Sequence, residues 1–476
     1  MAYDVAQHDQ RLKRDLKNRH IQMIALGGAI GTGLFYGSAD SISLAGPAIL
    51  IAYLIGGLII FWVVRALGEM SVHEPVAGAF THYAHKYWSR RAGFVSGWNY
   101  WFNYIAVAMV ELAVVGSFVN YWLPEVPPWV SAAFFLVLIT FINLVGVKTF
   151  GEFEFWFAVV KVVAVIAMIV LGTVVVILGV NSNPELPDPS FSHLWDHGGF
   201  MPMGLTGIIA AMAVVMFSFG GTELVAVAAG EADRPQQSIP RAINQVILRI
   251  LLFYILALAV IMSVVPWHQI DGHSSPFVQI FDAVGITGAA HILNLVMLTA
   301  VISVYNSGLF SNARMLYSLA LQGNAPSFLT KVSGRGVPYW GVLISSAVTV
   351  IAVVVVMLWP DFAFRYLMSV ALAAALINWT MVMITHRKFR AQLSQEEREK
   401  LHFKLPAASV VFWIVLVFFA LLVVIMGWSQ QYRTAVFVGP LWLVLLLVAY
   451  EIKTRRRSQR PGQPQQHSQP ASKHVR

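Results

Sequence analysis

The sequence has no cysteine and little charge. Only 12% of its 476 residues are Asp, Glu, Lys or Arg, whereas a soluble domain carries about 25% charged residues. The missing cysteines exclude disulfides, thiolate nucleophiles and cysteine-ligated metals. The low charge excludes a soluble globular enzyme and a disordered chain, because both depend on many ionised side chains to stay in water.

The motifs of hydrolytic enzymes are also missing. The chain has no HExxH, no GxSxG and no pair of intramembrane aspartates, and its 14 histidines show no metal-ligand spacing. The glycine-rich stretch at 27–33 lacks the GxxxxGK[ST] order of a phosphate-binding loop. We therefore expect neither an enzyme nor an ATP-driven pump, and we expect no metal and no organic cofactor.

Long apolar runs dominate the sequence instead. Hydrophobic residues make up 58% of the chain, in blocks that reach the roughly 20 residues of a membrane-spanning helix. An outer-membrane barrel would show segments of about ten residues with alternating hydrophobicity, and these blocks do not alternate. The runs predict an all-α membrane protein with 12 transmembrane helices. They lie near 21–43, 47–70, 94–122, 128–147, 153–180, 203–229, 243–265, 285–320, 338–359, 362–385, 406–427 and 434–451.

The distribution of charge predicts the orientation of these helices. The chain has 32 Lys and Arg against 23 Asp and Glu, a net charge of +9. Nearly all the basic residues fall on the termini and on loops of the same side, so the positive-inside rule predicts two cytoplasmic termini. This distribution explains the charge without a nucleic-acid partner. Residues 1–20 are then a basic cytoplasmic end, and 452–476 form a disordered cytoplasmic tail with much Gln, Pro and Ser.

Two predicted spans contain residues that ordinary membrane helices avoid. The first carries Gly-Gly-Ala-Ile-Gly-Thr-Gly at 27–33, and the sixth carries Phe-Ser-Phe-Gly-Gly-Thr-Glu at 217–223. Close helix packing is one interpretation, because several of the glycines are four residues apart. Packing does not explain why Thr32 and Glu223 accompany the glycines.

The other interpretation is a pair of discontinuous helices, which is the best sequence indication of a transporter site. An opened turn leaves amides and carbonyls that must face protein or ligand inside the membrane. Amides at a half-helix start suit a carboxylate, and freed carbonyls suit an ammonium group. Most membrane phenylalanines face lipid or core, but one beside an opened turn could cover a bound substrate. The predicted substrate site comprises Ile30, Gly31, Thr32, Gly33, Phe217, Ser218 and Phe219.

Three ionisable residues are predicted to lie inside the membrane: Glu111, Lys161 and Glu223. Each such charge costs at least about 2.5–3.5 kcal/mol to insert, so each needs a function or a partner. Lys161 either extends its amine to the headgroups or is a buried amine that gains and loses a proton. Glu223 either pairs with a freed amide or lines the site and relays protons. Glu111 either contacts the substrate or pairs internally.

Several short motifs are distributed along residues 12–455. They are Ala-Leu-Gly-Gly-Ala-Ile-Gly-Thr-Gly-Leu-Phe at 25–35, Ala-Leu-Gly-Glu-Met at 66–70, Gly-Trp-Asn-Tyr-Trp at 97–101, Gly-Glu-Phe-Glu-Phe-Trp at 151–156 with Lys161, and Ser-Ile-Pro-Arg-Ala at 238–242. Together these motifs resemble the bacterial amino-acid permeases of the amino acid–polyamine–organocation superfamily. Within that family, residues 35–40 are most similar to proline-specific and histidine permeases, and residues 108–113 to aromatic and histidine permeases.

The resemblance implies a fold of two inverted five-helix repeats, 21–180 and 203–385, plus two peripheral helices at 406–451. It also implies symport of an amino acid and a proton across the bacterial inner membrane by a single chain. The overlap of the two motif similarities favours histidine, with proline or an aromatic amino acid as alternatives.

The resemblance also assigns the coupling residues. Related permeases place a lysine where ion-coupled relatives bind sodium, so it implies that Lys161 couples transport to the proton. Glu223 is a second candidate for proton coupling and, with Glu111, for contact with the substrate. Arg65 and Glu69, four residues apart, are predicted to be a structural or gating pair. A channel would not need two broken helices and an internal cation. A transporter-like sensor, which would signal without substrate flux, stays open.

Overall fold

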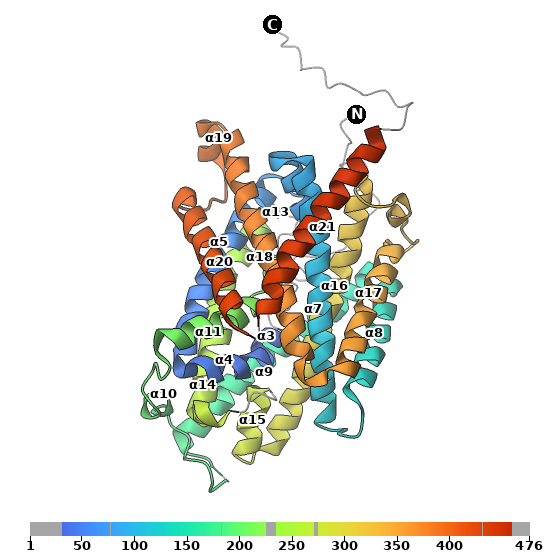
Figure 1. Ribbon diagram of the computed structural model, residues 1–476. Helices are drawn as coiled ribbons and strands as arrows, with labels where there is room; N and C mark the ends of the chain where they lie inside the picture. Colours follow the sequence, from blue (N-terminus) through green and yellow to red (C-terminus); the bar gives the residue numbers. More distant parts are fainter. Residues whose placement is uncertain are drawn as a thin grey trace.

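The computed structural model describes residues 31–76, 78–181, 183–224, 235–270, 275–430 and 432–458. Within these ranges the chain is helical and has no strand. The long helices run side by side in one bundle, and α19 and the end of α21 project from the same end of it (Figure 1). The prediction of an all-α protein is confirmed.

The helices divide into two stretches of the chain. Up to residue 217 they are α3 (Thr32–Phe35), α4 (Gly37–Ala45), α5 (Ile49–His73), α6 (Ala79–Tyr83), α7 (Arg90–Asn120), α8 (Pro128–Val145), α9 (Val147–Leu178), α10 (His193–Asp196) and α11 (Gly204–Phe217). After it they are α13 (Pro235–Ile250), α14 (Ala257–Val264), α15 (Pro276–Ala283), α16 (Thr287–Leu321), α17 (Tyr339–Leu358), α18 (Pro360–Gln392), α19 (Gln395–Lys400), α20 (Ala408–Trp428) and α21 (Arg433–Ser458).

Nine helices in the described part of the chain are long and apolar enough to cross a membrane. The sixth and seventh predicted spans contain only the shorter apolar helices Gly204–Phe217 and Phe253–Val264. The sixth is short because α11 ends in turns at Phe217, as analysed below. Of the first predicted span, residues 21–30 lie outside the described residues, and the remainder forms α3 and α4.

The predicted C-terminal tail begins later than we expected. Helix α21 continues through Ser458, so residues 452–458 are helical, and residues 459–476 lie outside the described residues. Contacts explain the extension: Lys453 donates a hydrogen bond to Asn324, and its Nζ lies 5.3 Å from the ring centroid of Phe94. These partners lie in α7 and in the loop after α16, so the sequence of the tail alone does not predict the contacts.

Helices α7 and α16 form the centre of the bundle, and α18 packs against α7. Glycines allow the close approach. A Cβ atom at Gly97 of α7 would lie 2.5 Å from Leu319 of α16, and one at Gly308 of α16 would lie 3.2 Å from the Tyr104 ring. Real Cβ atoms do not approach other atoms as closely as 2.5 Å, so a larger residue at Gly97 would require the Leu319 side chain to shift.

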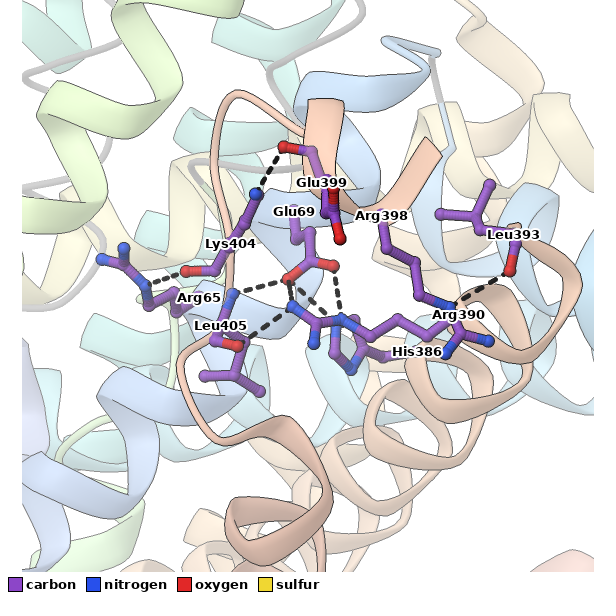
Figure 2. Close-up of polar contacts among 9 residues, drawn as sticks. All are labelled: Arg65, Glu69, His386, Arg390, Leu393, Arg398, Glu399, Lys404 and Leu405. Atoms are coloured by element: carbon purple, nitrogen blue, oxygen red, sulfur yellow. Dashed lines mark hydrogen bonds and ion pairs between the residues drawn. The ribbon is translucent and has the colours of Figure 1, made fainter. Parts of the chain in front are cut away.

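At one end of the bundle, a buried carboxylate ties α5 to α18 and to the loop before α20 (Figure 2). Arg390 donates from two nitrogens to the two Glu69 oxygens, each at 2.7 Å. The Leu405 N–H donates to the same carboxylate at 2.6 Å, and Nε2 of His386 lies 3.2 Å from it. Arg65 instead donates to a backbone carbonyl of the same loop at 2.7 Å. Arg65 and Glu69 therefore hold the helix end through different partners. We call this cluster the Glu69 network.

Candidate functional site

The two predicted breaks are in direct contact. Helix α3 begins at Thr32, after Gly31 in an extended conformation, and α11 ends at Phe217. A Cβ atom at Gly33 would lie 2.5 Å from the Cα and 2.7 Å from the Oγ of Ser218. The start of α3 therefore meets the end of α11 backbone to backbone. This close contact requires glycine at position 33. Ile30, the other residue predicted for this edge, lies outside the described residues.

The interruption after α11 is built from tight turns. The Gly220 N–H donates to the Phe217 carbonyl at 2.9 Å, and the Leu224 N–H donates to the Gly221 carbonyl at 3.1 Å. Gly221 has a φ of +93°, a conformation that costs glycine little and other residues much. From Phe219 the described N–H groups bond three residues back and no longer four, at the place where the sequence predicts an opened turn.

An internal carboxylate occupies the start of α3. The Thr32 hydroxyl donates a hydrogen bond to Glu111 of α7, and the Thr32 backbone N–H bonds to the same side chain. Both residues are buried. The amides at a helix start have no partner within the helix, and here the Glu111 side chain takes the place that we predicted for a substrate carboxylate. Of the two alternatives for Glu111, this structure shows internal pairing.

Lys161 lies in the same buried cluster. Its side chain is fully buried, so it does not extend to the headgroups. It interacts electrostatically with Glu154 and Glu111. Glu154 precedes Lys161 by seven residues on α9, which is two helical turns and the same face. Glu154 also accepts a hydrogen bond from Ser303 of α16 at 2.8 Å. We call Lys161, Glu111 and Glu154 the lysine cluster.

Glu154 is a site residue that our sequence analysis did not select. It appears there only within the motif at 151–156. The available signal was its seven-residue spacing from Lys161, which places a carboxylate and an amine on one face of a membrane helix. A buried amine needs such a partner, because an isolated charge inside a membrane is expensive.

Glu223 lies apart from the lysine cluster. Tyr104 of α7 donates a hydrogen bond to its Oε1 at 3.2 Å, and Trp379 of α18 lies beside the carboxylate. Its other oxygen, Oε2, is buried and has no hydrogen-bond partner among the described residues. Glu223 thus lies among groups of α7, α18 and the segment after α11, while Lys161 lies among other carboxylates.

The three residues at the end of α11 have different surroundings. Tyr254 donates a hydrogen bond to the Ser218 carbonyl at 2.9 Å, and the Ser218 hydroxyl lies 3.2 Å from that of Tyr53. Phe219 is fully buried, with its ring centroid 5.8 Å from Tyr53 and 5.3 Å from Tyr254. Phe219 is part of an aromatic cluster in this structure, whereas no such ring contact is seen for Phe217 within the described ranges.

Metal ligands are not grouped in the part of the chain that the structure describes. No set of three or more His, Cys, Asp or Glu side chains there could hold a metal ion. Near the two breaks, the buried ionisable groups are arranged as one amine among carboxylates and one carboxylate beside aromatic side chains. That arrangement can hold and move protons and can bind a zwitterion between two broken helices.

Comparison with known proteins identifies the family. A family model described as amino acid permease matches residues 20–460. The chain belongs to the amino acid permease family. This permease is 51% identical over 449 residues to the aromatic amino acid transport protein AroP of Escherichia coli, a match that covers 94% of this chain and 97% of the relative.

Two other relatives extend the comparison. AroP of Salmonella typhimurium is 50% identical over 454 residues, which cover 95% of this permease and 98% of the relative. The uncharacterized amino acid permease YtnA of Bacillus subtilis is 43% identical over 441 residues, 93% of this permease and 95% of the relative. The predicted family is confirmed, and with it a multi-pass inner-membrane transporter with an amino-acid substrate.

The predicted closeness to histidine and proline-specific permeases is not supported. The relatives above whose names include a substrate are aromatic amino acid transport proteins. Our prediction rested on two short motifs, 35–40 and 108–113, of which the second is shared by aromatic and histidine permeases. Identity across almost the whole chain distinguishes the substrate groups of permeases better than six residues near one helix break do.

Proposed function

We propose that this permease is a secondary active symporter that takes up an aromatic amino acid together with a proton. The observation that carries the proposal is the 51% identity to AroP over 94% of the chain. The positive-inside rule supports a bacterial inner-membrane orientation with both termini in the cytoplasm. We further propose two inverted five-helix repeats, a single chain as the functional unit, and no cofactor other than the proton.

The two broken helices support a binding site for the backbone of the amino acid. The amides at the start of α3 suit a carboxylate, and the hydrogen bonds between Thr32 and the Glu111 side chain at this place support the proposal. The turns after Phe217 leave carbonyls for the ammonium group. The side chain of the substrate would then face Tyr104, Glu223 and Trp379, which come together from α7, the segment after α11, and α18.

The charge of the lysine cluster supports proton coupling. With all three groups ionised, Lys161 contributes +1 and Glu111 and Glu154 contribute −1 each, so the cluster carries −1. A net charge inside the membrane is unfavourable, and one added proton makes the cluster neutral. If that proton binds Glu111, the carboxylate loses its hold on Thr32, and the amides of α3 become available to the substrate. Proton binding and substrate binding would thus favour the same state.

Uptake into proteoliposomes tests both parts of this proposal. We expect labelled phenylalanine to accumulate when the outside is more acidic than the inside, and unlabelled tyrosine and tryptophan to block it while proline does not. Lys161→Met should lower pH-driven accumulation at least tenfold, because it removes the amine of the lysine cluster. Lys331→Met, at an exposed loop position, is the matched control and should transport normally.

Each result that contradicts the proposal identifies the part that is wrong. Competition by histidine or proline without competition by tyrosine would contradict the aromatic substrate. Accumulation that ignores the pH gradient would contradict proton coupling. Full accumulation by well-inserted Lys161→Met would remove Lys161 from the coupling mechanism, and signalling without any uptake would favour the sensor.

A further inference from the structure

A groove with mainly apolar walls runs between the peripheral helices and the bundle. Its volume is about 710 Å³, and its walls are the start of α7, α18, α20 and α21. Figure 1 shows α20 and α21 converging toward their connection, with α18 between them. The volume lies within the range of about 300–1,000 Å³ that is typical of pockets for small ligands.

The groove is about as long as one leaflet of the bilayer is deep. Its lining runs from Ala373 to Ile384 on α18 and from Ala435 to Leu447 on α21. At 1.5 Å per residue these stretches measure about 16 and 18 Å. The hydrocarbon core of a bilayer is about 30 Å thick, so one leaflet contributes about 15 Å. An acyl chain that starts at the interface can therefore follow the groove along most of its length.

Two residues of α21 keep the groove open. Gly439 and Pro440 lie in the middle of its wall. A Cβ atom at Gly439 would lie 3.6 Å from Ala373 and 3.7 Å from Ile377, so it would be in ordinary contact with α18 and would not clash. A larger side chain at position 439 would extend into the groove without a clash at its own Cβ.

One end of the groove carries positive charge. Trp88, Ser89 and Arg91 line that end, and Nζ of Lys388 lies 5.9 Å from the Trp88 ring centroid. Arg91 and Lys388 are both exposed. Tryptophan is typical of the membrane interface, and lysine or arginine at that level attracts anionic headgroups. The opposite end, at Met426 and Ala435, is apolar.

We propose that this groove binds one anionic phospholipid, with an acyl chain along α18 and α21 and its phosphate beside Arg91 and Lys388. The charge supports the proposal because Arg91 and Lys388 lie at the end of the groove where a headgroup would be. A helix from a second copy of the chain would match the apolar walls but not the cations at one end. The groove is distinct from the substrate site, so this proposal does not depend on which amino acid is carried.

The groove is connected to the candidate site by one aromatic contact. Phe419 lines the groove and stacks on Trp379, with ring centroids 6.0 Å apart. Trp379 in turn lies beside Glu223. A bound lipid would therefore contact Phe419, which packs against Trp379 on the side away from the proposed substrate.

Native mass spectrometry of the full-length permease tests the site. The probes are phosphatidylglycerol and phosphatidylcholine with identical acyl chains, titrated into delipidated protein. We expect one phosphatidylglycerol to remain bound where phosphatidylcholine dissociates. Arg91→Gln and Lys388→Gln should each weaken its binding about fivefold, while Lys331→Gln, an exposed lysine outside the groove, should not. Gly439→Leu should weaken both lipids, because it fills the apolar part.

Photo-crosslinking locates the bound lipid. A phosphatidylglycerol with a diazirine in its chain should react with α18, α20 and α21, and Gly439→Leu should reduce that reaction. Equal retention of the two lipids, or no effect of either cation variant, would overturn the anionic-lipid proposal. Labels spread evenly over α8, α9 and α17 would mean ordinary surrounding lipid and would also overturn it. A dimer in which α20 and α21 of two copies crosslink to each other would do the same.

Discussion

Gly33 is the residue on which contact between the two broken helices depends. Its Cβ would fall 2.5 Å from the backbone of Ser218, and backbone cannot rotate away as a flexible side chain can. Ser218 is itself held by Tyr53 and Tyr254. Any side chain at position 33 must therefore move α3 relative to the end of α11.

We expect Gly33→Ala to reduce uptake at least tenfold while the protein still inserts into the membrane. Overpacking of this kind costs about 1–3 kcal/mol, enough to displace the amides of α3 from their partners. Gly427→Ala is the matched control, because a Cβ there has nothing within 4 Å. Uptake and substrate affinity of the two variants should be compared at equal expression. Normal affinity in Gly33→Ala would show that the two breaks do not form the binding site.

At individual positions, the sequence indicated which residues matter better than it indicated their partners. Lys161 and Glu111 stood out because charge inside a membrane is expensive. That Glu111 joins Lys161 and Glu154 in one cluster could not be predicted, because α7 and α9 are brought together by the fold. Phe219 was chosen for its place beside the break, yet its neighbours Tyr53 and Tyr254 come from α5 and the turn before α14.

Among the helices, the Glu69 network is a connection made through a buried carboxylate. Glu69 is almost fully buried, and its carboxylate receives Arg390, His386 and the Leu405 amide (Figure 2). The network thus joins α5, α18 and the loop that leads into α20. Removing one partner of a buried pair leaves a charge without compensation, which is costlier than the pair itself is stabilising.

We expect Arg390→Gln to destabilise the protein by about 3–5 kcal/mol, seen as a melting temperature several degrees lower in detergent. Lys400→Gln breaks the exposed pair with Glu396 on α19 and should change the melting temperature little, because exposed pairs contribute at most about 1 kcal/mol. Equal melting of both variants would show that the Glu69 network does not hold these helices together.

The helices themselves were predictable, and the contacts that connect them were less so. Apolar runs locate α7, α8, α16, α17 and α20 because a membrane requires about 20 such residues and little else. The end of α11 was predictable from glycine chemistry at 217–223. The Glu69 network was not, because Arg65 and Glu69 are four residues apart and suggest a pair with each other, whereas Glu69 pairs instead with residues more than 300 positions later.

The whole molecule allows a direct test of its orientation, because the natural chain has no cysteine. A single introduced thiol is then the only one that a maleimide can label. Glu185 lies in a loop and Gln395 begins α19; both are exposed, in connections that the charge pattern assigns to opposite sides of the membrane.

We expect Glu185→Cys to react with a membrane-impermeant maleimide in intact cells, and Gln395→Cys to react only after the membrane is opened. The cysteine-free parent controls for background labelling. The reverse pattern would contradict the positive-inside prediction, and labelling of both positions in intact cells would contradict the number of spans between them.

The carboxylate at the start of α3 has one more consequence. In the mechanism we propose, an amino acid that arrives at this helix displaces the Glu111 side chain from Thr32, and Glu111 returns when the amino acid leaves. The start of α3 then has a hydrogen-bond partner in the empty carrier as well as in the loaded one. We therefore expect an acidic exterior, which favours protonated Glu111, to raise the apparent affinity for substrate.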